Sequence, residues 1–213
     1  MSRYVVLDLE MCNVPKFKKK EYRYATEIIE IGAVLLDEEL EVTDSFKTYV
    51  CPQYGRIDSI IQDLTGITTK ETAYAPFIEE ALTMFLEWLP DDVVLVAWSG
   101  SDAYQLRAET HAKRISLPRL NEILETSLDC QITFGEKMHS KRSYGLTEAL
   151  VIANVQYEDG AHDALVDARN TAMLFAKMLR EDELELNPYY TDEIEEPANC
   201  PFAELLAGYK CVG

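Results

Sequence analysis

The chain has 213 residues, of which 47% are hydrophobic and 27% charged, and its formal net charge is -18. This composition is typical of a globular protein with one substantial core, and no apolar run approaches the ~20 residues that span a membrane. The acidic total argues against a nucleic-acid-binding protein, but residues 181–213 contribute nine acids and one lysine, so 8 of the 18 excess negative charges lie there.

The N-terminal half predicts three consecutive strands. Residues 5–11, VVLDLEM, are apolar enough for burial on both faces, and residues 28–36 and 42–50 continue as a meander. The basic segment between the first two strands, residues 16–24, is too polar for a core element and predicts a loop. Its lysines are interpreted either as a solvated surface or as contacts to phosphates.

Helices alternate with strands in the rest of the chain. A short helix over residues 59–64 precedes a turn, and Pro76 predicts the first position of a helix that ends at Pro90. An apolar strand over residues 93–98 follows. We then expect a helix over residues 102–115, a strand over 124–129, and helices over 131–138, 145–154 and 161–181.

This order of elements predicts an α/β layer structure with a mixed sheet. The composition becomes acidic and proline-containing after Glu185. We therefore expect a compact domain over residues 1–185 and an acidic extension over residues 186–213. FAELLAGY, residues 202–209, predicts a small docking helix in the extension, and one hypothesis is that the extension occupies the active-site groove as a polyanion mimic.

Four acids lie in segments that otherwise look buried. Asp8 and Glu10 point to the same side of the first strand, because side chains alternate along a strand. Asp102 comes just after the strand over residues 93–98, where α/β sheets place their ligands. Asp167 lies on a helix that is otherwise mostly apolar. The alternative for Asp102, or for the preceding Ser101, is a simple helix N-cap.

Four converging carboxylates without a counter-charge would raise one another's pKa values and destabilise the ionised fold. Divalent cations remove this conflict, and a set of hard oxygen ligands favours Mg²⁺ or Mn²⁺ over zinc. Two such ions ~4 Å apart form the clamp that enzymes use for in-line phosphodiester cleavage. We therefore expect two metal ions, held by Asp8, Glu10, Asp102 and Asp167.

His162 precedes Asp167 by five residues, so the two would lie about 140° apart around a helix. At the entrance to the helix, after Gly160, His162 can turn toward the acids. A neutral imidazole with a pKa near ~6.5 can there take a proton from the attacking water. We predict His162 as the general base, and an ordinary surface or capping histidine is the alternative.

These residues resemble the three motifs of the DEDDh, or DnaQ-like, 3′-to-5′ exonucleases, in the order of that family. D-x-E is Asp8 and Glu10, the middle aspartate is Asp102, and H-x-A-x-x-D-A spans residues 162–168. The sequence is most similar to the Eri-like and KapD-like branch, because EIIEIGAVLLD, F-K-T-Y-V and L-T-G-I match its second motif block. The resemblance covers residues 3 to about 180. The turn before Asp102 is W-S-G-S instead of the more usual W-G-x-x.

The resemblance implies a ribonuclease H-like fold, with a mixed sheet of about five strands flanked by helices. It also implies removal of nucleotides from a single-stranded 3′ end as 5′-monophosphates. In that scheme Asp8 bridges both ions, Glu10 and Asp167 complete the ion beside the attacking water, and Asp102 holds the other mostly through water. His162 is the base.

Substrate binding is also implied by the resemblance. Met11, Leu64 and Thr65 bracket the terminal nucleotide. We expect RNA as the partner ahead of DNA, with a DNA-directed exonuclease, for proofreading or degradation, and a catalytically silent binding module as alternatives. Tyr144, which lies in a basic loop, is a candidate for stacking on a base.

The expected location is the cytoplasm, because MSRYVVLDLE has no apolar leader with a cleavage site. The five scattered cysteines, without a C-x-x-C pair, are expected to be reduced thiols. We expect no membrane partner. The sequence identifies neither protein partners nor the natural substrate, processivity or oligomeric state.

Overall fold

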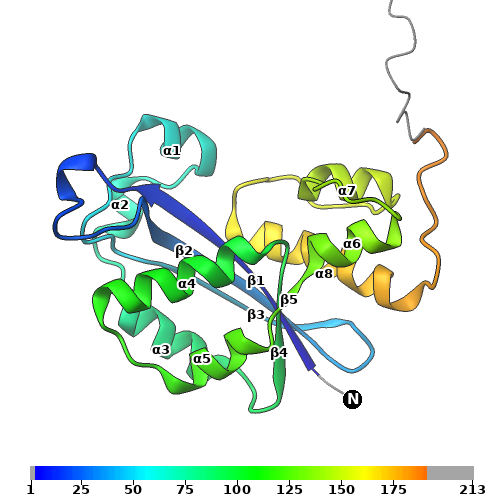
Figure 1. Cartoon of the computed structure of the whole chain (residues 1–213), viewed down its shortest axis with the longest axis horizontal. Coiled ribbons are helices and arrows are strands. Elements are labelled where there is room, and N and C mark those ends of the chain that lie inside the picture. Colours follow the sequence, from blue (N-terminus) through cyan, green and yellow to red (C-terminus); the bar gives the residue numbers. More distant parts are fainter. Residues whose placement is uncertain (1–2, 191–213) are drawn as a thin grey trace, which may run out of the picture.

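A mixed, five-stranded sheet forms the centre of the protein, which is described here from a computed structural model over residues 3–190. The strand order is β3-β2-β1-β4-β5, and the long β1 and β2 run through the middle (Figure 1). The strands β1, β2 and β3 pair antiparallel, whereas β4 and β5 run parallel to β1. The strands are β1 (Arg3–Asn13), β2 (Thr26–Leu36), β3 (Val42–Tyr49), β4 (Val93–Ala97) and β5 (Leu128–Asp129). The predicted mixed sheet of about five strands is confirmed.

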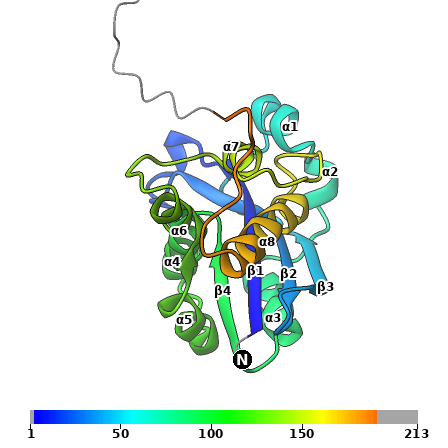
Figure 2. The same ribbon diagram turned by 90° about the vertical axis from the view of Figure 1, so that its right-hand side faces the viewer.

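Helices cover both faces of the sheet. They are the 3-10 helix η1 (Lys16–Lys18), α1 (Ser59–Thr65), α2 (Thr69–Thr72), α3 (Ile78–Trp88), α4 (Gly100–Lys113), α5 (Pro118–Glu125), α6 (Cys130–Lys137), α7 (Leu146–Ile152) and α8 (Ala164–Arg180). Val5, Leu7 and Leu9 of β1 pack with α3, α4 and α5. Val6 packs with α6, α7 and α8 on the opposite face, and Figure 2 shows α8 lying along β1 and β2.

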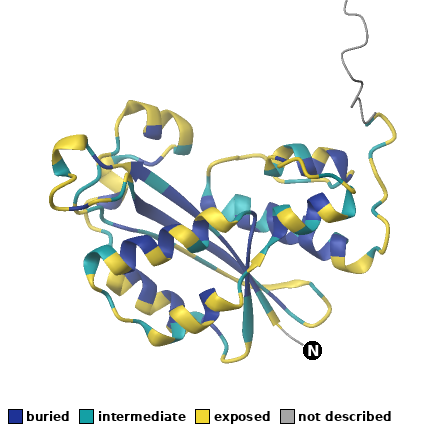
Figure 3. Cartoon of the chain, viewed as in Figure 1, coloured by how far each residue is buried: buried dark blue, intermediate teal, exposed yellow. Residues whose placement is uncertain are grey.

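The burial pattern follows from this layering, as Figure 3 shows. Strand β1 is buried on both faces, as its apolar sequence predicts. Because side chains alternate, Asp8 and Glu10 share the face of Val6, which is the face covered by α8. The two acids therefore lie beside the N-terminal end of that helix and not in the apolar layer of α3.

Two sequence expectations about elements are corrected, and one short helix was missed. Only Leu128–Asp129 forms a strand in the region expected as a strand over residues 124–129, because Leu124 belongs to α5 and packs in the core. Pro76 does not occupy the first helical position, since Phe77 is the N-cap and α3 begins at Ile78. The short α2, which has a complete capping box, was not expected.

The prediction that Tyr144 stacks on a base is also wrong. Its side chain is buried and packs edge-to-face on Phe134, with ring centroids 5.2 Å apart. It cannot stack on a base, because its ring is part of the core between α6 and α7. The basic character of its neighbours in sequence had suggested a surface position. Phe85 lies in the core and Trp88 packs at its rim, whereas Phe77 is 54% exposed.

The described chain continues in contact with the domain beyond Glu185. The Asn187 N–H donates to the Ile152 carbonyl at 2.8 Å, and Tyr190 packs against the cluster on the α8 face. The domain boundary at 185 stays a prediction. The rest of the acidic extension, including FAELLAGY, lies outside the described residues. Within residues 3–190, none of the helices has the length and apolar character needed to cross a membrane.

Candidate active site

One cleft of about 720 Å³ gathers residues that are far apart in the sequence. It lies at the C-terminal ends of β1 and β4, beside the N-terminal ends of α4, α7 and α8. Seven of the eight predicted site residues line it: Asp8, Glu10, Met11, Leu64, Asp102, His162 and Asp167. A larger hollow of about 1000 Å³ lies at the opposite end of β4, between Asp92, Pro118 and Thr126, and contains none of them.

The two acids of β1 are strongly affected by burial. Glu10 is only 7% exposed, and burial, followed by the charge of Asp167, raises its pKa to about 8. Burial also raises the pKa of Asp8 well above its usual range, and the next largest cause is the charge of Asp102. The register of β1 on β2 shifts between Glu10 and Met11, so the regular pairing is interrupted at the cleft. Burial and neighbouring carboxylates thus disfavour the ionised form of both acids, as the sequence suggested.

Asp102 lies in the first turn of α4 and is 5% exposed. Burial raises its pKa to about 7, against the lowering effect of backbone N–H groups and the Ser101 hydroxyl. The N-cap of α4 is Ser99, whose side chain accepts from the Ser101 N–H. The alternative interpretation of Asp102 or Ser101 as an N-cap is therefore wrong, and the Asp102 carboxylate lies in the cleft instead.

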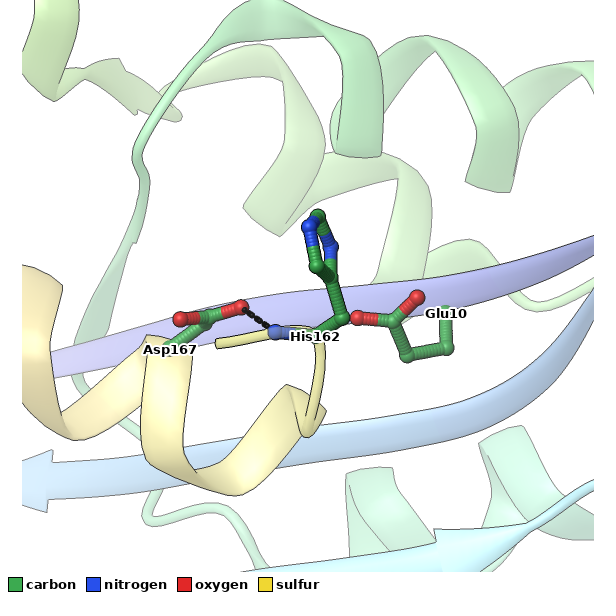
Figure 4. A group of neighbouring side chains, drawn as sticks. All are labelled: Glu10, His162 and Asp167. Atoms are coloured by element: carbon green, nitrogen blue, oxygen red, sulfur yellow. Dashed lines mark hydrogen bonds between the residues drawn. The ribbon is translucent and has the colours of Figure 1, made fainter. Parts of the chain in front are cut away.

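The third motif is organised around the start of α8. Asp163 is the N-cap, so His162 lies outside the helix, with a left-handed φ of 68°. Its backbone N–H donates to Asp167 Oδ2 at 2.8 Å (Figure 4). Burial raises the pKa of Asp167, and this hydrogen bond opposes the rise. His162 is thus held next to Asp167 by its backbone, while its imidazole is directed into the cleft.

The structure also shows how α8 is positioned, which the sequence did not predict. The buried Glu30 of β2 accepts from the Ala164 N–H at 3.0 Å. Lys47 of β3 lies 3.0 Å from Glu30 Oε1 and 2.6 Å from Asp163 Oδ2. A side chain at Gly32 would overlap the backbone of Ala164. The sheet therefore fixes the start of α8 by two acids, one lysine and a close backbone approach.

The residues expected to bracket a nucleotide differ in their exposure to the cleft. Met11 and Leu64 line it, and Leu64 is 47% exposed. Thr65 is not among the lining residues. Its hydroxyl donates to the Ile61 carbonyl at 2.9 Å and accepts from the Ile67 N–H at 3.1 Å, so it closes the end of α1.

Several lining residues were missed from the sequence: Asn13, Thr26, Ile61, Trp98, Ser99, Ser101 and the segment 145–148. Most are small or apolar side chains without a chemical signature of their own. For Ser99 and Ser101 the position directly after an apolar strand was an available signal, because such ends face ligands in α/β sheets. Asp163 was also detectable, since an aspartate before a helix is a common N-cap.

The donor set fits divalent cations. One imidazole nitrogen of His162 and one carboxylate oxygen each of Glu10 and Asp167 lie within 4.8 Å of one another. Asp8 and Asp102 line the same cleft, and all four acids have raised pKa values. Hard oxygen donors and local negative charge are what Mg²⁺ and Mn²⁺ require. A carboxylate cluster of this kind is stable in its ionised form when a cation neutralises it.

Comparison with known sequences gives a consistent assignment. The family model described as "Exonuclease" (RNase_T) matches residues 5–175. The chain is 31% identical over 178 residues to a PolC-type DNA polymerase III of Caldanaerobacter subterraneus, covering 84% of this chain and 12% of that protein. It is also 31% identical to DNA polymerase III subunit epsilon of Aquifex aeolicus, covering 84% and 81%. For ERI1 exoribonuclease 2 of Danio rerio the identity is 31%, covering 72% and 31%.

The fold has a close match among solved structures. The nuclease domain of 3′hExo, described as a DEDDh family member bound to rAMP, superimposes with a TM-score of 0.73. The identity is 24%, and the match covers 87% of this chain and 96% of that one. This likeness confirms the predicted ribonuclease H-like fold. The chain therefore belongs to the exonuclease family, because the family model matches most of its length.

Proposed function

We propose that the protein removes nucleotides one at a time from the 3′ end of single-stranded RNA, and that it uses two Mg²⁺ or Mn²⁺ ions and releases 5′-monophosphates. The observation that carries this proposal is the meeting of four acids with raised pKa values, two buried and two half-buried, and His162 in one cleft. Perturbed carboxylates in a cleft are typical of catalytic sites.

Asp8, Glu10, Asp102 and Asp167 would hold the cations. When bound, such ions supply positive charge that stabilises the attacking and leaving oxygens of an in-line displacement. Asp8 would serve both ions, Glu10 and Asp167 the ion on the side of the attacking water, and Asp102 the other. The proximity of Glu10 and Asp167 to His162 supports this division, because one ligand atom of each residue lies within 4.8 Å of the others.

His162 would act as the general base. Its position before the N-cap of α8 leaves the imidazole free of the helix, and its N–H bond to Asp167 fixes its backbone. The imidazole can then take the proton of the attacking water. The backbone at His162 is left-handed, and the side chain lines the cleft next to Glu10 and Asp167.

Met11 and Leu64 would contact the faces of the terminal nucleotide. Both side chains are apolar and line the cleft, and they belong to two different elements, β1 and α1. Thr65 would contribute indirectly, because its hydroxyl bonds hold the end of α1 on which Leu64 lies. This arrangement grips a base without reading its identity, since apolar contacts to the base faces suit any base.

Two of the reported relatives support different substrates. Similarity to ERI1 exoribonuclease 2 and to a nuclease domain bound to rAMP favours RNA. Similarity to DNA polymerase III subunit epsilon, over 81% of that protein, favours the second candidate, a DNA-directed exonuclease. RNA and DNA differ at the 2′-OH, so the choice rests on contacts near Met11 and Leu64.

We also infer a cytoplasmic location, which the free thiols of Cys12, Cys51 and Cys130 support.

The test is degradation of 5′-labelled strands of matched sequence, as ssRNA, ssDNA and duplexes with a 3′ overhang. We expect a ladder of products shortened by single nucleotides, fastest on ssRNA, and no ladder with Asp8→Asn. Faster degradation of ssDNA would select the DNA-directed alternative. Binding without degradation of any substrate would select the catalytically silent module, and degradation by Asp8→Asn at the wild-type rate would contradict the assigned site.

A further inference from the structure

The segment that joins β1 to β2, residues 14–25, concentrates positive charge in an acidic protein. It carries five of the chain's 20 Lys and Arg residues, against one acid, Glu21. The residues on either side of it, Asn13 and Thr26, both line the active-site cleft. The segment therefore leaves the cleft and returns to it, and Figure 1 shows it as the dark blue loop at the end of β1.

The backbone of this segment is held in place by Tyr22. The Tyr22 side chain is buried, its hydroxyl donates to the Thr26 carbonyl at 3.1 Å, and its N–H donates to the Lys18 carbonyl at 2.9 Å. Its ring stacks on Tyr54 with centroids 5.2 Å apart. The lysines on either side are thus presented by an anchored turn that contains η1.

Most of the lysines in the segment are available for a ligand. Lys16, Lys19 and Lys20 are exposed, and within residues 3–190 none of them forms an ion pair. Only Lys18 is paired, with Glu21 at 3.1 Å. Unpaired ammonium groups on a chain of net charge -18 create a local positive field, which attracts polyanions. Phosphates are the groups that such a cluster binds.

An exposed aromatic ring lies among these lysines. Phe17 is 66% exposed, and the Arg56 guanidinium lies 5.5 Å from its ring centroid. Arg56 is fixed to the cleft end of β1, because its N–H donates to the Asn13 carbonyl at 2.9 Å. An exposed ring with cations around it is the combination that stacks one base and holds the adjoining phosphates of a single strand.

We propose that Lys16, Phe17, Lys19, Lys20 and Arg56, the basic platform, bind the substrate strand upstream of the 3′ nucleotide held in the cleft. The inference rests on the proposed exonuclease function and adds the site that provides affinity for the strand. The four acids of the cleft would balance the charge of the two cations they hold, so the cleft adds no net positive charge and attraction for a longer strand comes from outside it. The basic platform is the cationic surface that begins at the cleft.

The first test compares a variant that lacks three lysines of the basic platform with a control variant that lacks three arginines elsewhere. Lys16→Gln, Lys19→Gln and Lys20→Gln are combined in one variant, and Arg3→Gln, Arg107→Gln and Arg114→Gln in the control. The three arginines are exposed, form no ion pair within residues 3–190 and lie outside the cleft lining. Both variants change the net charge by the same amount. KM is measured at several salt concentrations, on a strand of about 16 nucleotides and on a dinucleotide.

The lysine variant is expected to lower the salt dependence of log KM by about 2, since each phosphate contact to a single strand contributes ~0.7. Its KM for the long strand should rise about tenfold or more at low salt, while kcat and turnover of the dinucleotide stay unchanged. The arginine control should match wild type on both substrates. Equal salt dependence in the two variants would overturn the inference. Absence of turnover by the wild type would instead contradict the proposed function.

The second test separates stacking from charge. Phe17→Ala should weaken binding of the long strand about tenfold, because one base loses its stacking partner, without changing the salt dependence. Phe17→Tyr keeps a ring and should restore affinity. Binding is followed by fluorescence anisotropy of a labelled strand without divalent cations, so turnover does not interfere. Unchanged affinity of Phe17→Ala, together with unchanged salt dependence of the lysine variant, would identify the segment as an ordinary solvated loop.

Discussion

At the residue scale, the site depends on acids placed where their charges are costly. Asp8 and Glu10 occupy a strand whose other residues are mostly apolar and buried. Burial is the largest cause of the raised pKa of each, and the neighbouring acids add to it. A protein retains such groups when another interaction offsets the cost, and we propose that a divalent cation does so here.

The role of His162 can be tested with little disturbance of the fold. Its φ of 68° is one that asparagine adopts more readily than most residues, so His162→Asn keeps the backbone and removes the base. We expect kcat to fall by roughly 10²–10⁴-fold. The free energy of unfolding should change by less than ~0.5 kcal/mol. Single-turnover kinetics and urea denaturation measure the two quantities, and a wild-type kcat in a folded variant would rule out the base.

The four acids could be identified from the sequence, because a charged residue in an apolar segment is visible without a structure. His162 could be identified from its spacing to Asp167 and the motif that the two share. It failed where position depends on tertiary contacts. Tyr144 has polar neighbours in sequence and is nevertheless buried against Phe134. The pairing of Lys47 with Glu30 and Asp163 joins residues on three elements, and no local pattern indicates it.

At the element scale, the start of α8 must approach β2 closely. Gly32 allows this approach, since any side chain there would overlap the backbone of Ala164 and Leu165. Asp167 and the hydrogen bond from His162 both lie within the first turn of this helix or just before it. The distance between sheet and helix therefore controls the geometry of the third motif.

Gly32→Ala should displace the start of α8. We expect a loss of roughly 1–3 kcal/mol in the free energy of unfolding, and a fall in kcat at temperatures where the variant is folded. Gly145→Ala is the matched control. A side chain at Gly145 meets open space at a φ of -69°, so its cost should stay below ~0.5 kcal/mol. Equal stability of both variants would show that the close approach does not constrain the helix.

Long periodic elements were predicted well from the sequence, whereas short ones were not. Strand β5 has two residues, which is too few for alternation to be visible, and the predicted strand wrongly included the last two residues of α5, Leu124 and Glu125. Pro118 at the first helical positions and the spacing of Leu120, Ile123 and Leu124 were the available signals for α5. For α2, the Thr68 and Glu71 capping box was visible in the sequence.

At the scale of the whole molecule, stability and metal binding are linked through pH. Burial raises the pKa of Glu10 to about 8 and that of Asp102 to about 7, whereas unfolded carboxyl groups titrate near ~4. Between these values the folded chain binds more protons than the unfolded chain. The free energy of unfolding of the metal-free protein should therefore fall as the pH rises through that window.

Mg²⁺ should reverse this trend, because the cation binds the ionised ligands. A hundredfold excess over the dissociation constant stabilises by ~2.7 kcal/mol, which raises Tm by roughly 5–10 °C in a protein of this size. We expect that gain near pH ~8 and little gain near pH ~5. Asp8→Asn should show little gain at either. Differential scanning calorimetry measures the shifts, and a gain independent of pH would show that these carboxyl groups are not the ligands.

The most direct test of a shared metal site in the cleft is the number of Mn²⁺ ions that the full chain binds tightly. This number is measured by equilibrium dialysis with electron paramagnetic resonance. Wild type should bind two, and Asp8→Asn at most one, because Asp8 would serve both ions. Asp91→Asn, which removes an exposed acid at the opposite end of β4, should still bind two. Binding of no ion by the wild type, or equal numbers in wild type and Asp8→Asn, would contradict a shared metal site in this cleft.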